Sequence, residues 1–155
     1  MSIEETVSSG IEQLDEQLSC LRIGDNVVWE VDAGTYIDFF ADRFVYHSLM
    51  KKCNVVYVSF NKSPMTLTKR FHDFPNPEHF TLVDCFTSGK GNNDETFLKF
   101  YGTEHKNINV IRLDAPEDIE SFKAEINKIE EERNGTRFVF DSLTGMQDLW
   151  GDETR

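Results

Sequence analysis

The chain has 155 residues, enough for one domain with a substantial core, so residues 1–155 are expected to form a single domain. Hydrophobic residues make up 39% of the chain and charged residues 28%, which is typical of a globular protein. Acidic residues outnumber basic ones by 28 to 16, and Lys and Arg form no cluster, which argues against binding to nucleic acid or to an anionic membrane.

The sequence shows no targeting signal and no metal-ligand spacing. Residues 1–5 are acidic rather than basic and then apolar, unlike a signal peptide, and no run of about eighteen apolar residues predicts a membrane span. The cysteines and histidines have neither zinc-ligand spacing nor the pattern of a disulfide framework: Cys20, Cys53, Cys85, His47, His72, His79 and His105. We therefore expect free thiols, no metal site and a cytoplasmic location.

The first half of the chain alternates strand and helix signals. Residues 27–31 (Val-Val-Trp-Glu-Val) predict a strand, and residues 37–50 place apolar side chains on one face of a helix. Residues 54–60 are dense in β-branched and aromatic residues and predict a second strand. Ser63-Pro64 is typical of a helix start, with Ser as the cap and Pro at the first helical position.

The second half continues the alternation. Residues 80–86 and 108–113 predict two strands, separated by a flexible loop at 88–94. A helix is expected from Pro116 to a cap at Asn134-Gly135, before a last strand at 137–140 that runs into Asp141. Strands that alternate with helices indicate an α/β fold with a mostly parallel sheet.

The turn after the first predicted strand lies where a phosphate-binding loop of pattern G-x-x-x-x-G-K-[ST] would be. In that frame Val31 and Tyr36 occupy the glycine positions, Ile37 the lysine position and Asp38 the hydroxyl position. Such a loop needs glycines to curl its N–H groups around a phosphate, a Lys for the β- and γ-phosphates and a hydroxyl for Mg²⁺. The turn therefore lacks the glycines, the Lys and the hydroxyl that nucleotide hydrolysis requires.

Three segments, in order, resemble the KaiC-like branch of the RecA superfamily of ATPases. Residues 9–18 (SGIEQLDEQL) are similar to the family's T-G-I-x-x-L-D-x-x-L, and residues 56–64 (VYVSFNKSP) to V-Y-V-S-F-E-E-S-P. Residues 138–144 (FVFDSLT) are similar to its Walker B strand, which ends in D-S-L-T. The resemblance covers essentially the whole chain and implies a three-layer α/β sandwich of RecA type.

The departures from the family pattern fall on the residues that carry its chemistry. The resemblance implies a Lys and a Thr or Ser where this chain has Ile37 and Asp38, and paired glutamates that activate water where it has Asn61 and Lys62. An amide cannot act as a general base, and an ammonium group is already protonated at neutral pH. Asp141 is retained at the position that assists the metal.

We therefore expect a non-catalytic pseudo-ATPase with a regulatory, signalling or assembly role through protein contacts or self-association. No catalytic residue and no cofactor are predicted; ligands in this fold bind beyond the carboxyl ends of the strands. The predicted positions of the degenerate nucleotide site are Asp32, Gly34, Thr35, Tyr36, Ile37, Asp38, Asn61, Lys62, Asp141 and Ser142. The alternative is a weakly hydrolytic member that binds ATP and Mg²⁺ through an unorthodox loop.

Three further expectations concern the ends of elements. The carboxylate of Asp38, or of Asp32, is a candidate to occupy the anion site at the start of the helix over 37–50. The other interpretation is that these are acidic residues of the kind commonly found in the first turn of a helix, with no such role. Ser88-Gly89-Lys90-Gly91 is read as a solvated loop rather than a phosphate site. The chain stops soon after the D-S-L-T strand, so we expect either a reduced form of the domain or a piece of a longer protein. Both leave an apolar sheet edge or face that another segment or protein would have to cover.

Overall fold

The computed structural model describes residues 6–105 and 108–151. Its centre is a sheet of four parallel strands in the order β5-β4-β3-β6, formed by Asn109–Arg112, Phe80–Asp84, Val55–Ser59 and Arg137–Asp141. β3 and β4 are buried along their whole length, which explains why they read as continuous apolar runs. The predicted strands at 54–60, 80–86, 108–113 and 137–140 are confirmed, each to within one or two residues.

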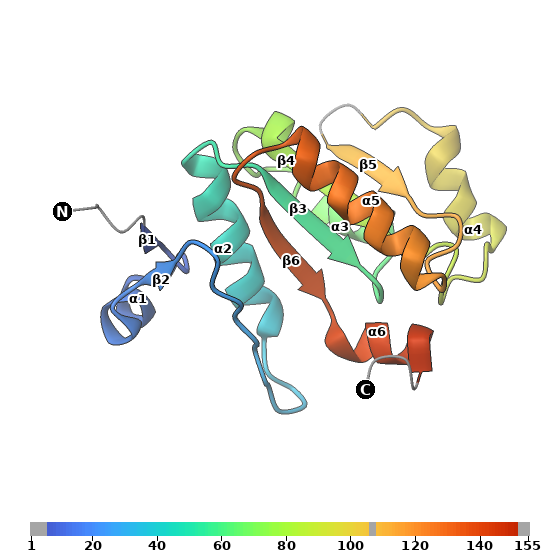
Figure 1. Ribbon diagram of the computed structural model, residues 1–155. Coiled ribbons are helices and arrows are strands. Elements are labelled where there is room, and N and C mark those ends of the chain that lie inside the picture. Colours follow the sequence, from blue (N-terminus) through green and yellow to red (C-terminus); the bar gives the residue numbers. More distant parts are fainter. Residues whose placement is uncertain (1–5, 106–107, 152–155) are drawn as a thin grey trace.

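Helices cover both faces of this sheet, so the predicted three-layer sandwich is confirmed (Figure 1). On one face, α2 (Ile37–Met50) and α3 (Pro64–Arg70) pack through Val45, Leu49, Leu67 and Phe71. On the other face, α5 (Ile119–Glu132) and α6 (Leu143–Trp150) pack through residues that include Phe122, Ile129 and Trp150. The sheet thus separates two apolar cores.

Two predicted helix starts can be compared with the structure. Ser63 caps α3 as expected, and its Oγ accepts a hydrogen bond from the Thr66 N–H at 3.3 Å. The helix expected from Pro116 begins only at Ile119, because Asp118 is the residue that caps it and accepts from Glu120 N at 3.1 Å. The Pro116 carbonyl instead accepts a hydrogen bond from Trp150 Nε1 at 2.8 Å.

The prediction of a strand at residues 27–31 is wrong for this structure. Their backbone pairs with no strand among the described residues, and Val27, Val28, Trp29 and Val31 are all exposed. A strand requires a hydrogen-bonded neighbour, which a local sequence pattern cannot supply. The segment runs instead as extended chain between the short antiparallel pair β1–β2 and helix α2.

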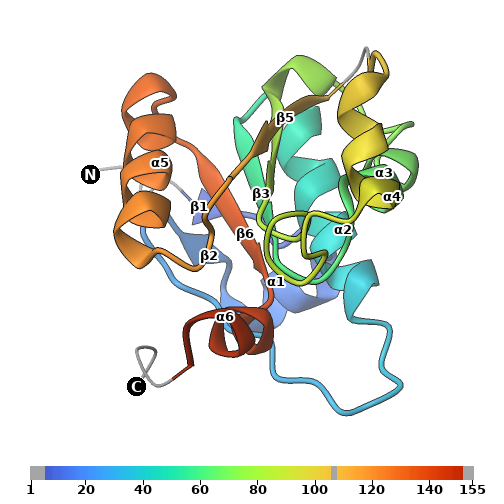
Figure 2. The same ribbon diagram turned by 90° about the vertical axis from the view of Figure 1, so that its right-hand side faces the viewer.

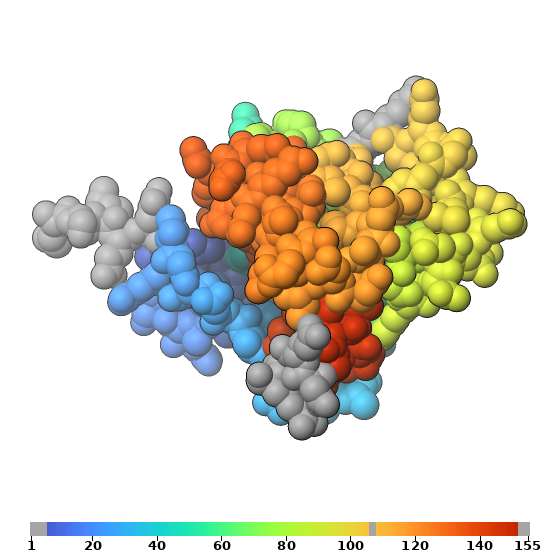
Figure 3. Space-filling model, turned by 45° about the vertical axis from the view of Figure 1, so that its right-hand side comes forward, coloured from blue at the N-terminus to red at the C-terminus, as the bar shows by residue number. Residues whose placement is uncertain are grey.

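Smaller elements complete the fold. β1 (Thr6–Val7) and β2 (Leu21–Arg22) flank helix α1 (Glu12–Leu18). This N-terminal part forms a lobe, coloured blue in the space-filling view (Figure 3), that contacts α2 through a hydrogen bond from Arg43 Nε to Gly10 O at 3.2 Å. A 3₁₀ turn η1 (Pro77–His79) precedes β4. Helix α4 (Glu95–Leu98) and the 3₁₀ turn η2 (Lys99–Gly102) follow it, after a series of turns over the predicted loop 88–94.

No helix in the described part of the chain is long and apolar enough to cross a membrane.

Candidate functional site

The carboxyl ends of β3 and β6 meet at one edge of the sheet, and α2 begins there. β3 and β6 are in register, so that Ser59 lies beside Asp141. The chain leaves β3 through Asn61 and Lys62, and it leaves β6 through Ser142. This edge therefore gathers side chains from three elements.

Lys62 links two carboxylates at this edge. Its Nζ lies 2.7 Å from Asp38 Oδ1 on α2 and 3.0 Å from Asp141 Oδ2 at the end of β6. The Tyr57 hydroxyl also donates to Asp141 Oδ2, at 2.8 Å. The side chains of Lys62 and Asp141 are 28% and 21% exposed, so the pair is largely shielded from water.

Arg70, at the end of α3, adds a second cation to this group. Its guanidinium is 15% exposed, contacts Asp42 through two nitrogens and lies 3.3 Å from Asp38. We call Asp38, Asp42, Lys62, Arg70 and Asp141 the charged cluster. It holds two cations against three carboxylates, so each positive group has at least two acidic partners.

The pKa shifts follow from these contacts. Burial disfavours the charged forms of Lys62 and Asp38, but hydrogen bonds and charge interactions together outweigh it, those of Lys62 with Asp38 and Asp141 and those of Asp38 with Lys62 and Arg70. The pKa of Lys62 is therefore raised above its ordinary value and that of Asp38 is lowered. Burial, followed by the neighbouring Asp141, raises the pKa of Tyr57 far above its ordinary value. At neutral pH Lys62 and Asp38 are therefore both charged, and Tyr57 is a neutral donor.

A second polar group lies beside the cluster. Asn61 Nδ2 donates to Ser142 Oγ at 2.8 Å, and Lys90 Nζ lies 2.5 Å from Asn61 Oδ1 and 2.7 Å from Asp148 on α6. Ser142 also caps α6 by accepting from Gly145 N at 3.2 Å. Lys90 therefore ties its loop to Asn61, which follows β3, and to α6.

The structure does not bring the turn at 32–36 into this group. Asp32, Gly34, Thr35 and Tyr36 are exposed, Tyr36 by 86%, and Ile37 is half-buried at the start of α2. Gly34 has φ +88° and open space around it. In the described residues α2 has no side-chain cap, and Asp38 faces Lys62 and Arg70. Asp38 thus pairs with cations and does not fill the start of the helix.

Sequence reasoning missed Tyr57, Arg70 and Asp42, and it read Lys90 as part of a solvated loop. One signal was present, because Asp38 and Asp42 are four residues apart and must share a helix face. Tyr57 likewise lies two residues before Ser59, on the same face of β3. Nothing in the sequence indicated that Arg70 would turn toward α2.

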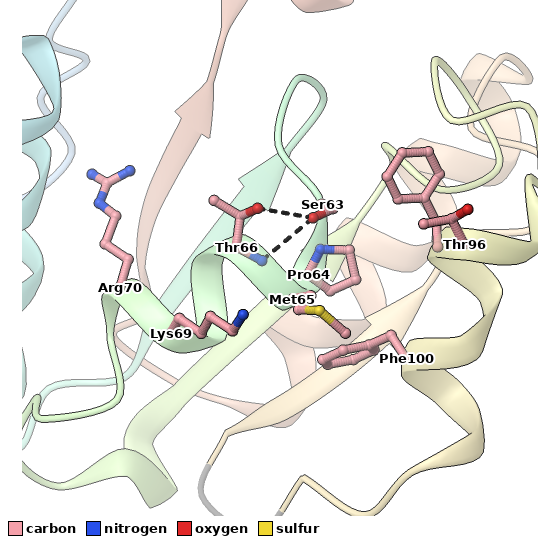
Figure 4. Close-up of a pocket in the computed structure, with 9 residues that line it drawn as sticks. Ser63, Pro64, Met65, Thr66, Lys69, Arg70, Thr96 and Phe100 are labelled. Atoms are coloured by element: carbon pink, nitrogen blue, oxygen red, sulfur yellow. Dashed lines mark hydrogen bonds between the residues drawn. The ribbon is translucent and has the colours of Figure 1, made fainter.

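Two hollows on the surface of the described residues can be compared with this site, and neither is lined by Lys62 or Asp141. One, of about 530 Å³, lies between α3 and α4, where Met65 and Phe100 approach one another (Figure 4). It shares only Arg70 with the charged cluster, and in the close-up this side chain extends away from Phe100. The other, of about 640 Å³, lies at the N-terminal lobe around Arg43 and His47.

The residues at the sheet edge do not fit a Mg²⁺-triphosphate. Asp141, the carboxylate available to a metal, is engaged by the Lys62 ammonium and the Tyr57 hydroxyl. In the frame that the resemblance gives, Ile37 occupies the position of the phosphate-binding Lys, and the turn before it, residues 32–36, is exposed. Within residues 6–105 and 108–151, no three His, Cys, Asp or Glu side chains are grouped to hold a metal ion.

Comparison with known proteins gives one result for nearly the whole chain. The model of a protein family described as "ATPase: KaiC" matches residues 7–155. No curated protein matches the sequence.

Proposed function

Since the chain belongs to the KaiC family of ATPases, we propose that it is a non-catalytic member, a pseudo-ATPase that acts in regulation, signalling or assembly through protein contacts. The observation that carries the proposal is the position of Lys62. Its ammonium group lies 3.0 Å from Asp141 Oδ2, where it neutralises the carboxylate that would otherwise attract a divalent cation.

The magnitudes favour loss of hydrolysis. Phosphoryl transfer depends almost wholly on positioning and charge neutralisation. Loss of one well-placed electrostatic donor typically slows a reaction on the order of a hundredfold to a thousandfold. Here Ile37, Asp38 and Asn61 together stand where the resemblance requires a cation, a hydroxyl and a base.

A contact role is supported by exposed apolar side chains near the same edge. Tyr36, Phe39 and Leu143 are 86%, 55% and 58% exposed, and they lie in or beside the turn at 32–36, α2 and α6. Large apolar side chains gathered on a surface typically mark an interaction site.

Calorimetric titration with Mg²⁺-ATP and Mg²⁺-ADP, extended to millimolar nucleotide, tests the proposal. We expect no saturable heat from the wild-type protein at several temperatures. Saturable binding that is lost in Asp141→Asn but kept in Asp73→Asn, a change at an 89% exposed carboxylate, would overturn it.

The alternative, an ATP-binding and weakly hydrolytic member, is favoured by one observation. Lys90 lies at the same sheet edge with its side chain 42% exposed, so one cation remains accessible there. Sedimentation with and without Mg²⁺-ATP separates the two functions. An assembly that is indifferent to nucleotide favours the pseudo-ATPase, whereas nucleotide-dependent assembly that is lost in Lys90→Met favours the alternative.

A further inference from the structure

Lys62 places one positive charge between two carboxylates that come from different elements. Its ammonium group lies 2.7 Å from Asp38 Oδ1 and 3.0 Å from Asp141 Oδ2. In the frame that the resemblance gives, Asp38 stands where a hydroxyl binds Mg²⁺, and Asp141 where a carboxylate assists the metal. One cation therefore bridges the two positions from which a catalytic member of the family would hold its ion, and this cation belongs to the chain itself.

The backbone of Lys62 is fixed on both sides, so the ammonium group is presented from one place. The hydroxyl of Ser59, which is 1% exposed, donates to Lys62 O at 2.8 Å and accepts from Lys62 N at 3.2 Å. The next residue, Ser63, caps α3. The fold therefore already provides the backbone order that the ion pairs of Lys62 would otherwise have to impose.

The ammonium group joins the start of α2 to the end of β6. Asp38 lies in the first turn of α2, and Asp141 is the last residue of β6. Figures 1 and 2 show α2 beginning at the end of the sheet where β6 passes into α6. A dissociable ion at this point would hold the two elements together only while it is bound. A tethered cation has a high effective concentration there at all times.

The spacing of the two carboxylates suits a divalent cation after a small adjustment. Oxygen ligands lie about 2.3–2.6 Å from Ca²⁺ and about 2.0–2.1 Å from Mg²⁺, which also demands a stricter octahedral geometry. Replacement of the ammonium group by Ca²⁺ thus requires each carboxylate oxygen to move by roughly half an ångström, and Mg²⁺ requires more. The Asp38 side chain is 49% exposed, which leaves a path for an ion and its water ligands.

Arg70 is not placed to do the work of Lys62. Its guanidinium contacts Asp42 through two nitrogens and lies farther from Asp38, at 3.3 Å. Among the described residues its ion pairs are with these two carboxylates and not with Asp141. Arg70 therefore ties α3 to α2, and the connection to β6 depends on Lys62.

We propose that Lys62 is a tethered cation that occupies a latent divalent-cation site formed by Asp38 and Asp141, and that it holds α2 against β6 without a dissociable ion. The surface at this edge of the sheet then keeps one arrangement at any concentration of metal, which suits a domain that acts through protein contacts. This inference deepens the proposed function and rests on it, because it gives to Lys62 the place of a bound metal. An ordinary ion pair differs in one measurable respect: its removal weakens the fold and creates no cation site.

Thermal unfolding of Lys62→Ala in EDTA and in about 10 mM CaCl₂, at an ionic strength held constant with KCl, tests the proposal. A site of millimolar affinity should raise the midpoint of this variant by about 3 °C or more in CaCl₂. The control Lys90→Ala makes the same change in net charge at the same sheet edge and leaves both carboxylates unchanged. We expect the wild type and Lys90→Ala to shift by less than about 1 °C. The double variant Lys62→Ala with Asp38→Asn should lose most of the gain.

Equal shifts of Lys62→Ala and Lys90→Ala would overturn the proposal, because Ca²⁺ would then act only on the overall charge. A wild-type shift as large as that of Lys62→Ala would also overturn it, since the ammonium group would not be occupying the site. If Lys62→Ala is unfolded in EDTA, recovery of its far-UV circular dichroism in CaCl₂ is the expected result.

Lys62→Gln, which is uncharged and of nearly the same length, repeats the comparison if Lys62→Ala folds in neither buffer. Failure of both variants to fold in either buffer would count against the proposal, because Ca²⁺ would then not replace the ammonium group. The test contains no nucleotide, so its failure is distinct from that of the proposed function, which saturable binding of Mg²⁺-ATP to the wild type would overturn.

Discussion

Lys62 is the residue on which the charged cluster depends. Lys62→Met keeps most of the side-chain volume but leaves Asp141, which is only 21% exposed, with the Tyr57 hydroxyl as its remaining donor. We expect a loss of about 1–3 kcal/mol in the free energy of unfolding, below the value for a fully buried pair because Asp38 is half exposed. Urea denaturation measures it, with Lys51→Met, at an exposed position after α2, as the control. Equal stability of the two variants would mean that the cluster contributes nothing.

The same variant should change the acid limb of the stability curve. The pKa of Asp38 is lowered from 3.8, with burial opposed by Lys62 and Arg70, so its contribution is complete above pH 3.8 and is lost as the pH falls through the lowered pKa. The pKa of Lys62 is raised from 10.5, so its contribution persists until the solution is strongly alkaline. We expect the stability difference between wild type and Lys62→Met to be constant from about pH 5 to 9 and to shrink below about pH 4. If the stability difference did not vary with pH, Asp38 would be excluded as the partner through which Lys62 stabilises the fold.

At the scale of elements, α6 depends on close contact with the end of β3. A Cβ added to Gly145 would lie 2.7 Å from Phe60 Cβ and 2.8 Å from Asn61 Nδ2, so α6 would have to move. Gly145→Ala should therefore destabilise the protein by about 1–3 kcal/mol, although alanine is the better helix former. Gly102→Ala, where a Cβ meets nothing within 4 Å, is the matched control and should change stability by no more than about 0.5 kcal/mol. Thermal denaturation of both variants compares them, and equal midpoints would show that α6 adjusts without cost.

Elements were predictable from the sequence where local pattern and tertiary context agree. α2 begins and ends where its apolar periodicity predicts, and β3 is buried at all five positions as its β-branched residues indicate. Residues 27–31 carry the same strand signature and remain unpaired, because pairing is a property of two segments. In the site, the residues at the ends of β3 and β6 could be named from motifs. The partners of Lys62 could not, since Asp38 and Asp141 lie 24 and 79 positions away in sequence.

At the scale of the whole molecule, net charge competes with the local ion pairs. The chain carries a formal charge of −12, and its acidic residues repel one another over distances that salt controls. The Debye length falls from about 30 Å at 0.01 M salt to about 3 Å at 1 M, which removes this repulsion. Salt weakens exposed pairs such as Lys123–Glu120 as well, but such pairs contribute at most about 1 kcal/mol each. We therefore expect the urea midpoint to rise as KCl is raised over this range.

Variants that remove one positive charge test whether overall repulsion causes this salt response. Lys62→Met raises the net negative charge by one and removes a partly shielded pair that salt screens only weakly. The variant should therefore gain at least as much stability from KCl as the wild type. Lys123→Met makes the same charge change at a 59% exposed side chain, and it should gain about as much as Lys62→Met. Urea denaturation at several KCl concentrations measures all three slopes, because urea adds no charge of its own. A wild-type midpoint that falls with salt would mean that local ion pairs, and not overall repulsion, dominate the electrostatic free energy of this fold.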